Sequence, residues 1–522
     1  MDKQISSIAT LLFLHILLLH FRLGKCGNAT SICNNTPHPK LCNTLQITTS
    51  PHKTLDKNDV DLGRLSFRET LAQATNAHKL ISAMDSSSFD ELGRSAWSDC
   101  LELYQDTIHQ LNRSIDSKID AFDAQTWLSA AIANEQTCHS GFLDFNKSSQ
   151  LESLQLMLGD FSKTLANSLA INKAISPSAS NQKRDSDHFP DWVSARDRRL
   201  LWSSVKADVV VAQDGSGDYT TISEGLAAAK RRGGGGLRRF VIYVKKGVYR
   251  ENVEIKRSMK NLMLIGDGID ATVVSGDRSV KDGFTTFRSA TFAVSGKGFI
   301  ARGMTFENTA GPYKHQAVAL RSSSDFSVFF ECSFKGYQDT LYVHSQRQFY
   351  RDCDIYGTVD FIFGDAVALL QNCNIYVRRP IINQKNTVTA QGRKDPNENT
   401  GIVIQNSVIT AAPDLRPVQS LYKSYLGRPW KEYSRTVFSK CVIDGLIDPA
   451  GWLPWSGDFG LATLYYGEYM NSGVGGTTVG RVKWPGFHRI RYAAEAGMFS
   501  ARNFLAGDSW IPATGVPFTS GL

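Results

Sequence analysis

Two aspartates and two glutamines recur in this sequence at a spacing that would bring them together. Asp339 and Asp360 are 21 residues apart, and Gln316 and Gln338 are 22 residues apart. Two carboxyl groups held close together cannot both ionise easily, so the pKa of one rises and the pair offers an acid beside a base or nucleophile. Amide side chains can donate hydrogen bonds to a developing oxyanion. The four residues therefore indicate acid–base or nucleophilic catalysis.

Each aspartate lies among apolar and aromatic residues, which lower its solvation. The segments are Gln338-Asp339-Thr340-Leu341-Tyr342 and Asp360-Phe361-Ile362-Phe363-Gly364. An aspartate in a turn usually bonds only its own backbone, and this is the alternative for either residue taken singly. The matched spacing of two acids and two amides favours a site.

A third motif, Leu426-Gly427-Arg428-Pro429-Trp430, places an arginine between glycine and proline. The Arg428 guanidinium could bind one carboxylate through two N–H groups and keep it ionised. Several aromatic residues could stack on sugar rings, although such residues are more often part of the packing: Trp430, Trp452, Trp455, Tyr342 and Phe363.

The elements that would position these residues are short β-strands with a regular period. The tetrads Glu331-Cys332-Ser333-Phe334, Asp352-Cys353-Asp354-Ile355 and Asn372-Cys373-Asn374-Ile375 place cysteines 21 and then 20 residues apart. This period predicts an all-β, right-handed parallel β-helix, because the leucine ladder of leucine-rich repeats is absent. Coils stack about 4.8 Å apart, so residues one period apart lie above one another. Cys353 is then within disulfide reach of both Cys373 and Cys332.

The first half of the chain has a helical period instead. Apolar residues recur at steps of three and four through 61–84, 90–119, 121–143 and 149–175. Four such helices with short breaks predict an all-α four-helix bundle over residues 28–175. We therefore expect a helical domain in front of a β-helix domain that spans 206–522.

The ends and the junction of these domains carry targeting and processing signals. Residues 1–27 have the pattern of an export signal, with an uncleaved anchor as the alternative. Residues 176–205 form an exposed linker with a dibasic segment, Arg198-Arg199-Leu200-Leu201, that invites proteolysis. Apart from Cys26, which lies in or beside the export signal, the cysteines divide into four in each half, and an even number in each half fits a secreted protein. Glycosylation sequons occur at Asn28, Asn34, Asn112 and Asn146.

The charge of the chain is unevenly distributed. The formal net charge is +8, yet residues 1–205 carry 20 Lys and Arg against 22 Asp and Glu, whereas 206–522 carry 38 against 28. A basic second half favours a polyanionic partner, such as an acidic polysaccharide, a nucleic acid or an anionic surface. No cysteine or histidine cluster has zinc-ligand spacing, so no metal site is predicted.

Residues 206–522 resemble plant pectin methylesterases almost end to end. The resemblance rests on Gly247-Val248-Tyr249-Arg250-Glu251, on Gln316-Ala317-Val318-Ala319-Leu320 and on the three motifs quoted above, in the same order and at similar spacing. Residues 28–175 resemble the pectin methylesterase inhibitor domain in their four cysteines, their helices and the segment Asp99-Cys100-Leu101-Glu102-Leu103-Tyr104.

The resemblance implies hydrolysis of galacturonate methyl esters in cell-wall pectin, with release of methanol. Asp360 would be the nucleophile, and Asp339 would donate and accept the proton. Gln338 would stabilise the oxyanion, Gln316 would assist in substrate binding, and Arg428 would hold Asp360 ionised. The other expected substrate contacts are Thr286, Phe287, Tyr342, Phe363 and Trp430, with Trp455 as a further aromatic residue.

The resemblance also implies disulfides Cys33–Cys42, Cys100–Cys138 and Cys353–Cys373, and it leaves Cys332 and Cys441 unassigned. No metal or organic cofactor is implied. The helical half would be a pro-region that inhibits the enzyme or assists its folding until a subtilisin-like protease cuts near Arg198-Arg199-Leu200-Leu201. The expected partners are methyl-esterified homogalacturonan and separate inhibitor proteins, not nucleic acid. The enzyme would be a monomer after processing, in the extracellular cell wall (apoplast).

Other functions fit the residues less well. A polygalacturonase would need an aspartate cluster with a Gly-His-Gly-like motif, and a pectate lyase a calcium-binding set of acids; neither pattern occurs. An aspartic protease would need glycine after Asp339-Thr340, where Leu341 stands. A pectin-binding or inhibitor protein without catalysis would not need the Asp, Arg and Gln set. Paired carboxylates for glycosidase work remain an alternative.

Overall fold

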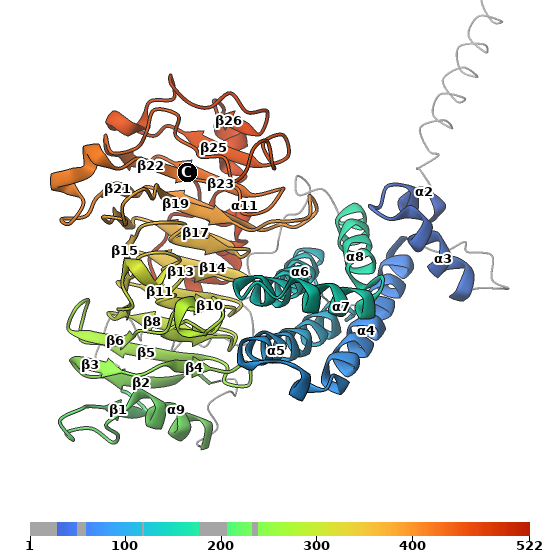
Figure 1. Ribbon diagram of the computed structural model, residues 1–522, viewed down its shortest axis with the longest axis horizontal. Helices are drawn as coiled ribbons and strands as arrows, with labels where there is room; N and C mark the ends of the chain where they lie inside the picture. Colours follow the sequence, from blue (N-terminus) through green and yellow to red (C-terminus); the bar gives the residue numbers. More distant parts are fainter. Residues whose placement is uncertain (1–28, 50–58, 117–118, 177–205, 232–237) are drawn as a thin grey trace, which may run out of the picture.

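The computed structural model describes residues 29–49, 59–116, 119–176, 206–231 and 238–522. Two bodies make up this part of the chain: a group of helices and a tall stack of short parallel strands (Figure 1). The expected export signal, the linker with its dibasic segment and Asn28 lie outside the described residues. Within the described ranges, no helix is long and apolar enough to cross a membrane.

The helical body follows the predicted period, with one correction. The predicted helix over 149–175 is broken, because Gly159 adopts a left-handed φ of 59° that ends one helix and starts the next. Asp90 and Asp120 cap the two longest interface helices by accepting hydrogen bonds from backbone N–H groups. The helices are α2 (Ala29–Asn34), α3 (Pro39–Thr49), α4 (Asp59–Ala83), α5 (Glu91–Ser114), α6 (Ala121–Asp144), α7 (Ser148–Leu158) and α8 (Phe161–Ile175).

Two disulfides stabilise the helical body. Cys33 and Cys42 are bonded at a Cα–Cα distance of 5.5 Å, and Cys100 and Cys138 join α5 to α6 at 4.6 Å. Both pairs are those that the resemblance implied.

The second body is a right-handed parallel β-helix of three sheets, whose strands are paired in parallel throughout. The 11-stranded sheet contains β1 (Val209–Val211), β2 (Phe240–Val244), β5 (Leu262–Gly266), β8 (Ile300–Arg302), β11 (Ser327–Phe330), β14 (Arg347–Arg351), β17 (Val367–Gln371), β20 (Gly401–Gln405), β23 (Arg435–Ser439), β25 (Tyr465–Tyr469) and β26 (Phe487–Arg489). Helix α9 (Ile222–Arg231) lies at the β1 end, and α10 (Ala493–Gly497) and α11 (Ala501–Phe504) follow β26 in the chain.

The other two sheets complete each coil. The 8-stranded sheet contains β3 (Gly247–Arg250), β6 (Thr272–Gly276), β9 (Thr305–Asn308), β12 (Ser333–Lys335), β15 (Asp354–Gly357), β18 (Asn374–Val377), β21 (Val408–Ala411) and β24 (Val442–Ile443). The 7-stranded sheet contains β4 (Val253–Ile255), β7 (Phe292–Val294), β10 (Leu320–Ser322), β13 (Leu341–Val343), β16 (Ile362–Gly364), β19 (Asn386–Gln391) and β22 (Ser424–Gly427).

The interior of the coils includes a ladder of buried cysteines, where one expectation is not met. Cys332, Cys353, Cys373 and Cys441 all carry free thiols, so the structure lacks the Cys353–Cys373 disulfide that the resemblance implied. The Cys353 thiol donates to the Arg351 carbonyl at 3.3 Å, and the Cys373 thiol donates to the Gln371 carbonyl at 3.4 Å. Burial raises the pKa of Cys353 well above its usual value, which keeps that thiol protonated.

The helical body packs against the β-helix through α5 and α6 (Figure 1). One apolar cluster spans both bodies and includes Phe142 from α6 as well as Phe287, Tyr342 and Phe363 from the β-helix. In α6 every residue from 124 to 138 is buried, which covers all sides of the helix. Several of these buried residues are polar: Gln125, Thr126, Ser129, Asn134, Glu135, Gln136 and Thr137.

Candidate active site

The two aspartates singled out by their spacing lie in equivalent turns of neighbouring coils. Each precedes a strand by two residues, Asp339 before β13 and Asp360 before β16, and Leu341 pairs with Ile362 in register. Both adopt left-handed backbone, with φ of 63° and 52°, which aspartate tolerates better than most residues. The parallel register therefore stacks the two carboxyl groups at the same edge of the sheet.

Asp360 is held by a guanidinium and a hydroxyl. Arg428 donates from Nε to Oδ1 at 2.8 Å and from Nη2 to Oδ2 at 2.7 Å. The Thr387 hydroxyl donates to Asp360 Oδ1 at 2.6 Å and accepts from the Asp360 backbone N–H at 2.9 Å. These bonds fix the orientation of the carboxylate and balance its charge.

The surroundings of Asp339, in contrast, disfavour its ionised form. Burial raises its pKa well above the ordinary value, the charges of Asp360 and Asp144 raise it further, and only Arg428 opposes them. Its side chain is buried, yet the residue lines the same cavity as Asp360. The site thus presents a protonated carboxyl beside a carboxylate that is bound by arginine.

The two glutamines also reach this cavity, although their register differs from the prediction. Leu320 of β10 pairs with Leu341 of β13, an offset of 21 residues, so Gln316 lies one residue out of register with Gln338. The Ala317 backbone N–H nevertheless donates to the Gln338 carbonyl at 3.2 Å. Both amide side chains line the cavity with the two aspartates and can donate to an oxyanion there.

Most of the predicted aromatic residues gather on one wall of the cavity. Tyr342 and Phe363 stack at 4.2 Å between ring centroids, and Trp430 meets Phe363 edge-on at 6.0 Å. The Arg428 guanidinium lies 4.4 Å from the ring centroid of Trp455. Trp452 is not part of this wall, because it is buried in the core against Tyr466.

The cavity is about 390 Å³ in volume, and the helical body forms part of its wall. Its β-helix lining includes Thr286, Phe287 and the residues described above. The rest of the lining comes from the C-terminal half of α6: Thr137, Ser140, Gly141, Leu143 and Asp144. The helical body therefore occupies the approach to both carboxyl groups.

Helix α6 makes directed contacts with this site. The Thr286 backbone N–H donates to Asp144 Oδ2 at 2.8 Å. The Thr137 hydroxyl lies 3.2 Å from the Tyr342 hydroxyl and 2.9 Å from His344 Nε2. Burial raises the pKa of Asp144 to about 6.

Helix α5 adds ion pairs beside the cavity. Arg288 donates from Nε to Asp99 Oδ1 and from Nη2 to Glu102 Oε2, both at 2.5 Å. Thr285 also donates to Asp99, whose carboxyl is fully buried. Further along the helix, Asp106 pairs with Arg257 of the β-helix.

Some residues of this site were not predicted from the sequence. Thr387 lies 27 residues after Asp360, because the coil between them is lengthened, so the period of 20 to 22 does not reveal it. Asp99 and Asp144 lie on helices whose apolar pattern signals packing only. Their role at the interface becomes visible when the two bodies are seen together.

Three of the four predicted glycosylation sequons can be placed. Asn34, Asn112 and Asn146 are exposed on the helical body. In the part of the chain that the structure describes, no group of three or more His, Cys, Asp or Glu side chains could hold a metal ion.

Comparisons with known proteins agree with this division of the chain. The Pectinesterase family matches residues 208–508, and the Plant invertase/pectin methylesterase inhibitor family matches residues 28–171. Pectinesterase 2 from Citrus sinensis is 52% identical over 494 residues, which cover 94% of each chain. The protein named Probable pectinesterase/pectinesterase inhibitor 6 from Arabidopsis thaliana is 52% identical over 531 residues, 94% of this chain and 93% of that one.

Solved structures match the β-helix body. Pectin methylesterase from carrot is 57% identical, with a TM-score of 0.60, over 61% of this chain and 99% of that chain. The pectin methylesterase from Aspergillus niger is 30% identical, with a TM-score of 0.51, over 59% of this chain and 96% of that chain.

Proposed function

The chain belongs to the pectinesterase family, and from this premise we propose that Asp360 and Asp339 hydrolyse the methyl esters of galacturonate units in pectin. The observation that carries the proposal is the pairing of an Arg428-bound carboxylate with a second carboxyl whose pKa is raised. Such a pair supplies a nucleophile and a proton donor at the same pH.

The first half of the reaction forms an acyl-enzyme. The Asp360 carboxylate attacks the C6 carbonyl carbon of the ester, and the amides of Gln338 and Gln316 donate hydrogen bonds to the resulting oxyanion. When the tetrahedral intermediate collapses, the C–O bond to the methoxy group breaks and Asp339 gives its proton to that oxygen. Methanol leaves, and an anhydride joins Asp360 to the galacturonate.

Water completes the reaction. Asp339, now ionised, takes a proton from the water that attacks the anhydride carbonyl, and Asp360 leaves as a carboxylate that Arg428 stabilises. The product is a galacturonate carboxylate. The stacked rings of Tyr342 and Phe363 offer a face for sugar rings, and the remaining expected substrate contacts are Thr286, Phe287, Trp430 and Trp455.

Methanol release from highly methylated pectin tests this function. Residues 206–522 are a suitable form, because the carrot enzyme folds as this body alone over 99% of its chain. We expect methanol from methylated pectin and none from the same pectin after chemical de-esterification. A folded domain that binds pectin without releasing methanol would instead be a binding protein.

We assign to the helical body the role of an inhibitor in cis. It lines the cavity with α6 and pairs with the cavity rim through Asp99 and Asp144, which supports a direct block of substrate entry. The same proposal includes cleavage by a subtilisin-like protease at Arg198-Arg199-Leu200-Leu201. It also includes secretion to the cell wall, regulation by separate inhibitor proteins and a monomeric mature enzyme.

Docking of the helical body should weaken as the pH rises. Burial raises the pKa of both Asp106 and Asp144 to about 6, whereas exposed carboxyls titrate near pH 4. The docked form therefore binds extra protons, and this stabilisation is complete below about pH 4 and lost as the pH rises through about 6. Burial also raises the pKa of Asp99, which acts in the same direction.

Other groups of the helical body oppose this trend. Burial lowers the pKa of His139, and nearby positive charges, chiefly that of Arg288, outweigh burial and lower the pKa of Glu102. Burial lowers the pKa of His109 to about 4, so its neutral form favours docking above that pH. We expect the three carboxyls with raised pKa values to outweigh these groups, which gives a net loss of affinity from about pH 4 to about pH 7. A chain cut at an engineered protease site in the linker should stay associated during gel filtration at the lower pH and separate at the higher pH. Asp144→Asn should flatten this dependence; an unchanged profile would contradict it.

A further inference from the structure

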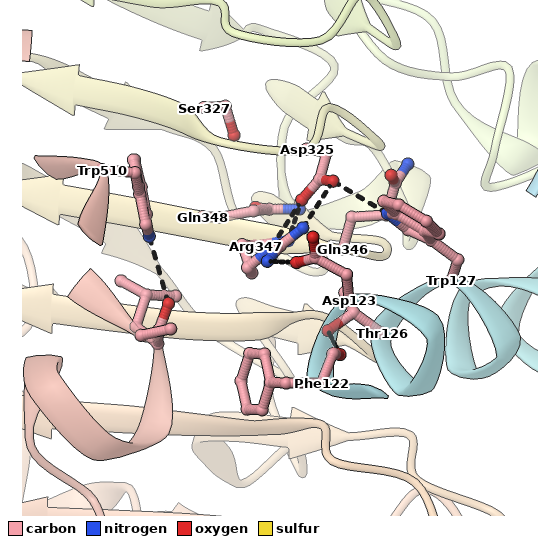
Figure 2. A network of polar contacts seen from close by, with 12 residues as sticks. Phe122, Asp123, Thr126, Trp127, Asp325, Ser327, Gln346, Arg347, Gln348 and Trp510 are labelled. Carbon is pink, nitrogen blue, oxygen red and sulfur yellow. Dashed lines mark hydrogen bonds and ion pairs between the residues drawn. The ribbon is translucent and has the colours of Figure 1, made fainter. Parts of the chain in front are cut away.

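Helix α6 meets the β-helix at a second place, around a buried ion pair between Asp325 and Arg347 (Figure 2). Arg347 donates from Nε to Asp325 Oδ1 at 2.8 Å and from Nη2 to Oδ2 at 2.9 Å. Its Nη1 donates to Asp123 of α6. The side chains of Arg347 and Asp325 are only 2% and 1% exposed, so the helical body covers a charged site.

The helical body also supplies donors to Asp325. The Trp127 indole N–H donates to Asp325 Oδ2 at 3.0 Å, and Arg113 Nη2 donates to the same oxygen at 3.2 Å. Arg113 lies over the Trp127 ring at 3.7 Å and donates to Gln346 at 3.4 Å. The covering group therefore presents one carboxylate, several N–H donors and an aromatic face.

Departure of the helical body would uncover both members of the ion pair. Arg347 Nη1 would lose the Asp123 carboxylate, and Asp325 Oδ2 would lose Trp127 and Arg113. Lys297 is close enough to interact with Asp325 and Arg347, so the uncovered group of three charges is net positive. Two cations around one carboxylate favour an incoming anion that also carries hydrogen-bond donors.

We propose that the Arg347–Asp325 site, once the helical body has left, binds a galacturonate unit of de-esterified pectin. The sugar carboxylate takes the place of the Asp123 carboxylate on Arg347, and sugar hydroxyls donate to Asp325 in place of Trp127 and Arg113. A methyl-esterified unit lacks the charge for this contact, so the site selects reaction product over substrate. The proposal rests on pectin being the substrate of the proposed function.

The site is far enough from the catalytic pair to need a long oligosaccharide. Asp123 and Thr137, which contact Arg347 and Tyr342, are 14 residues apart on α6. At 1.5 Å per residue they are about 21 Å apart along the helix. A trisaccharide bound at the aspartates therefore does not reach Arg347, whereas a long oligogalacturonate can contact both.

Binding of de-esterified oligogalacturonates to residues 206–522 tests the proposal. Arg347→Gln should weaken binding of a long oligogalacturonate by about tenfold, the effect of losing a charge-assisted contact, without changing trisaccharide binding or the kcat for methanol release. Arg502→Gln is the matched control, because Arg502 pairs with Asp508 on the exposed surface. It removes the same charge and should leave all three quantities unchanged.

A double variant guards against a folding defect in Arg347→Gln, which leaves Asp325 without its partner. Asp325→Asn with Arg347→Gln removes both charges, and it should show the same selective loss. Wild-type affinity of the double variant for the long oligogalacturonate would overturn the proposal, as would an equal loss for the trisaccharide. If Arg347→Gln leaves polymer binding by residues 206–522 unchanged but activates the uncut chain, Arg347 serves only to dock the helical body, and the proposal is overturned. Methanol release by unaltered 206–522, measured in parallel, reports on the proposed function separately.

Discussion

Asp360→Asn is expected to lower methanol release by residues 206–522 by at least about a thousandfold while the β-helix stays folded. An amide oxygen does not form the acyl-enzyme, and removal of a nucleophile has effects of this order or larger. The substitution should not strain the backbone, because asparagine tolerates the left-handed φ of 52° at this position as aspartate does. Initial rates on highly methylated pectin and thermal unfolding measure the two parts of this prediction.

Asp352→Asn is a matched control for the Asp360 variant. Asp352 also has a left-handed φ, of 51°, in a turn of the same β-helix, but it pairs with Arg351 at the surface. Its replacement removes one carboxylate from an equivalent backbone conformation and should leave the rate unchanged. A well-folded Asp360→Asn domain with more than a few per cent of the wild-type rate would show that the nucleophile is another group.

The uncut chain is expected to release methanol at less than about a hundredth of the rate of residues 206–522. Asp99→Arg should restore most of this activity without any cleavage. The substitution places a cation against Arg288 in a buried contact, where like charges cost several kcal/mol. About 5.5 kcal/mol is enough to shift the ratio of docked to undocked helical body from 99:1 to 1:99. The docked form would then no longer be the major one.

The control for this prediction changes charge at an exposed position of the same body. Asp160 pairs with Lys163 on the surface of the helical body, and both side chains are about half exposed. Asp160→Arg should leave the uncut chain inactive. If the uncut chain is as active as 206–522, the helical body does not block the site. If Asp99→Arg stays silent although the bundle is folded, the Arg288 contact is not what holds the two bodies together.

The coils and their catalytic pair were predictable because the β-helix has a strict period. Asp339 and Asp360 each stand two residues before a strand, and parallel register then requires their stacking. Gln316 was placed within one residue for the same reason. The pairing of Arg428 with Asp360 was expected from chemistry rather than spacing, since a lone arginine between glycine and proline has no periodic partner.

Features that break the period could not be predicted. Thr387 follows an extended coil, so counting residues does not bring it to Asp360. Gly159 interrupts a helical stripe whose apolar spacing continues across it. Asp123 and Asp144 face another domain, and an amphipathic pattern records only burial, not the partner that a polar side chain will find. Cys353 has a thiol on either side of it in the ladder, and spacing alone does not say whether it bonds to one of them or to neither.

The polar character of buried α6 has a consequence for what happens after the two bodies separate. Gln125 donates to the Asn397 carbonyl at 2.7 Å, and Asn399 donates to Thr126 at 2.9 Å. Water can replace each of these hydrogen bonds, so separation exposes no apolar patch at these positions on either body. After separation, both bodies should remain soluble. Their separation is then reversible, and the released helical body is free to bind another copy of the enzyme.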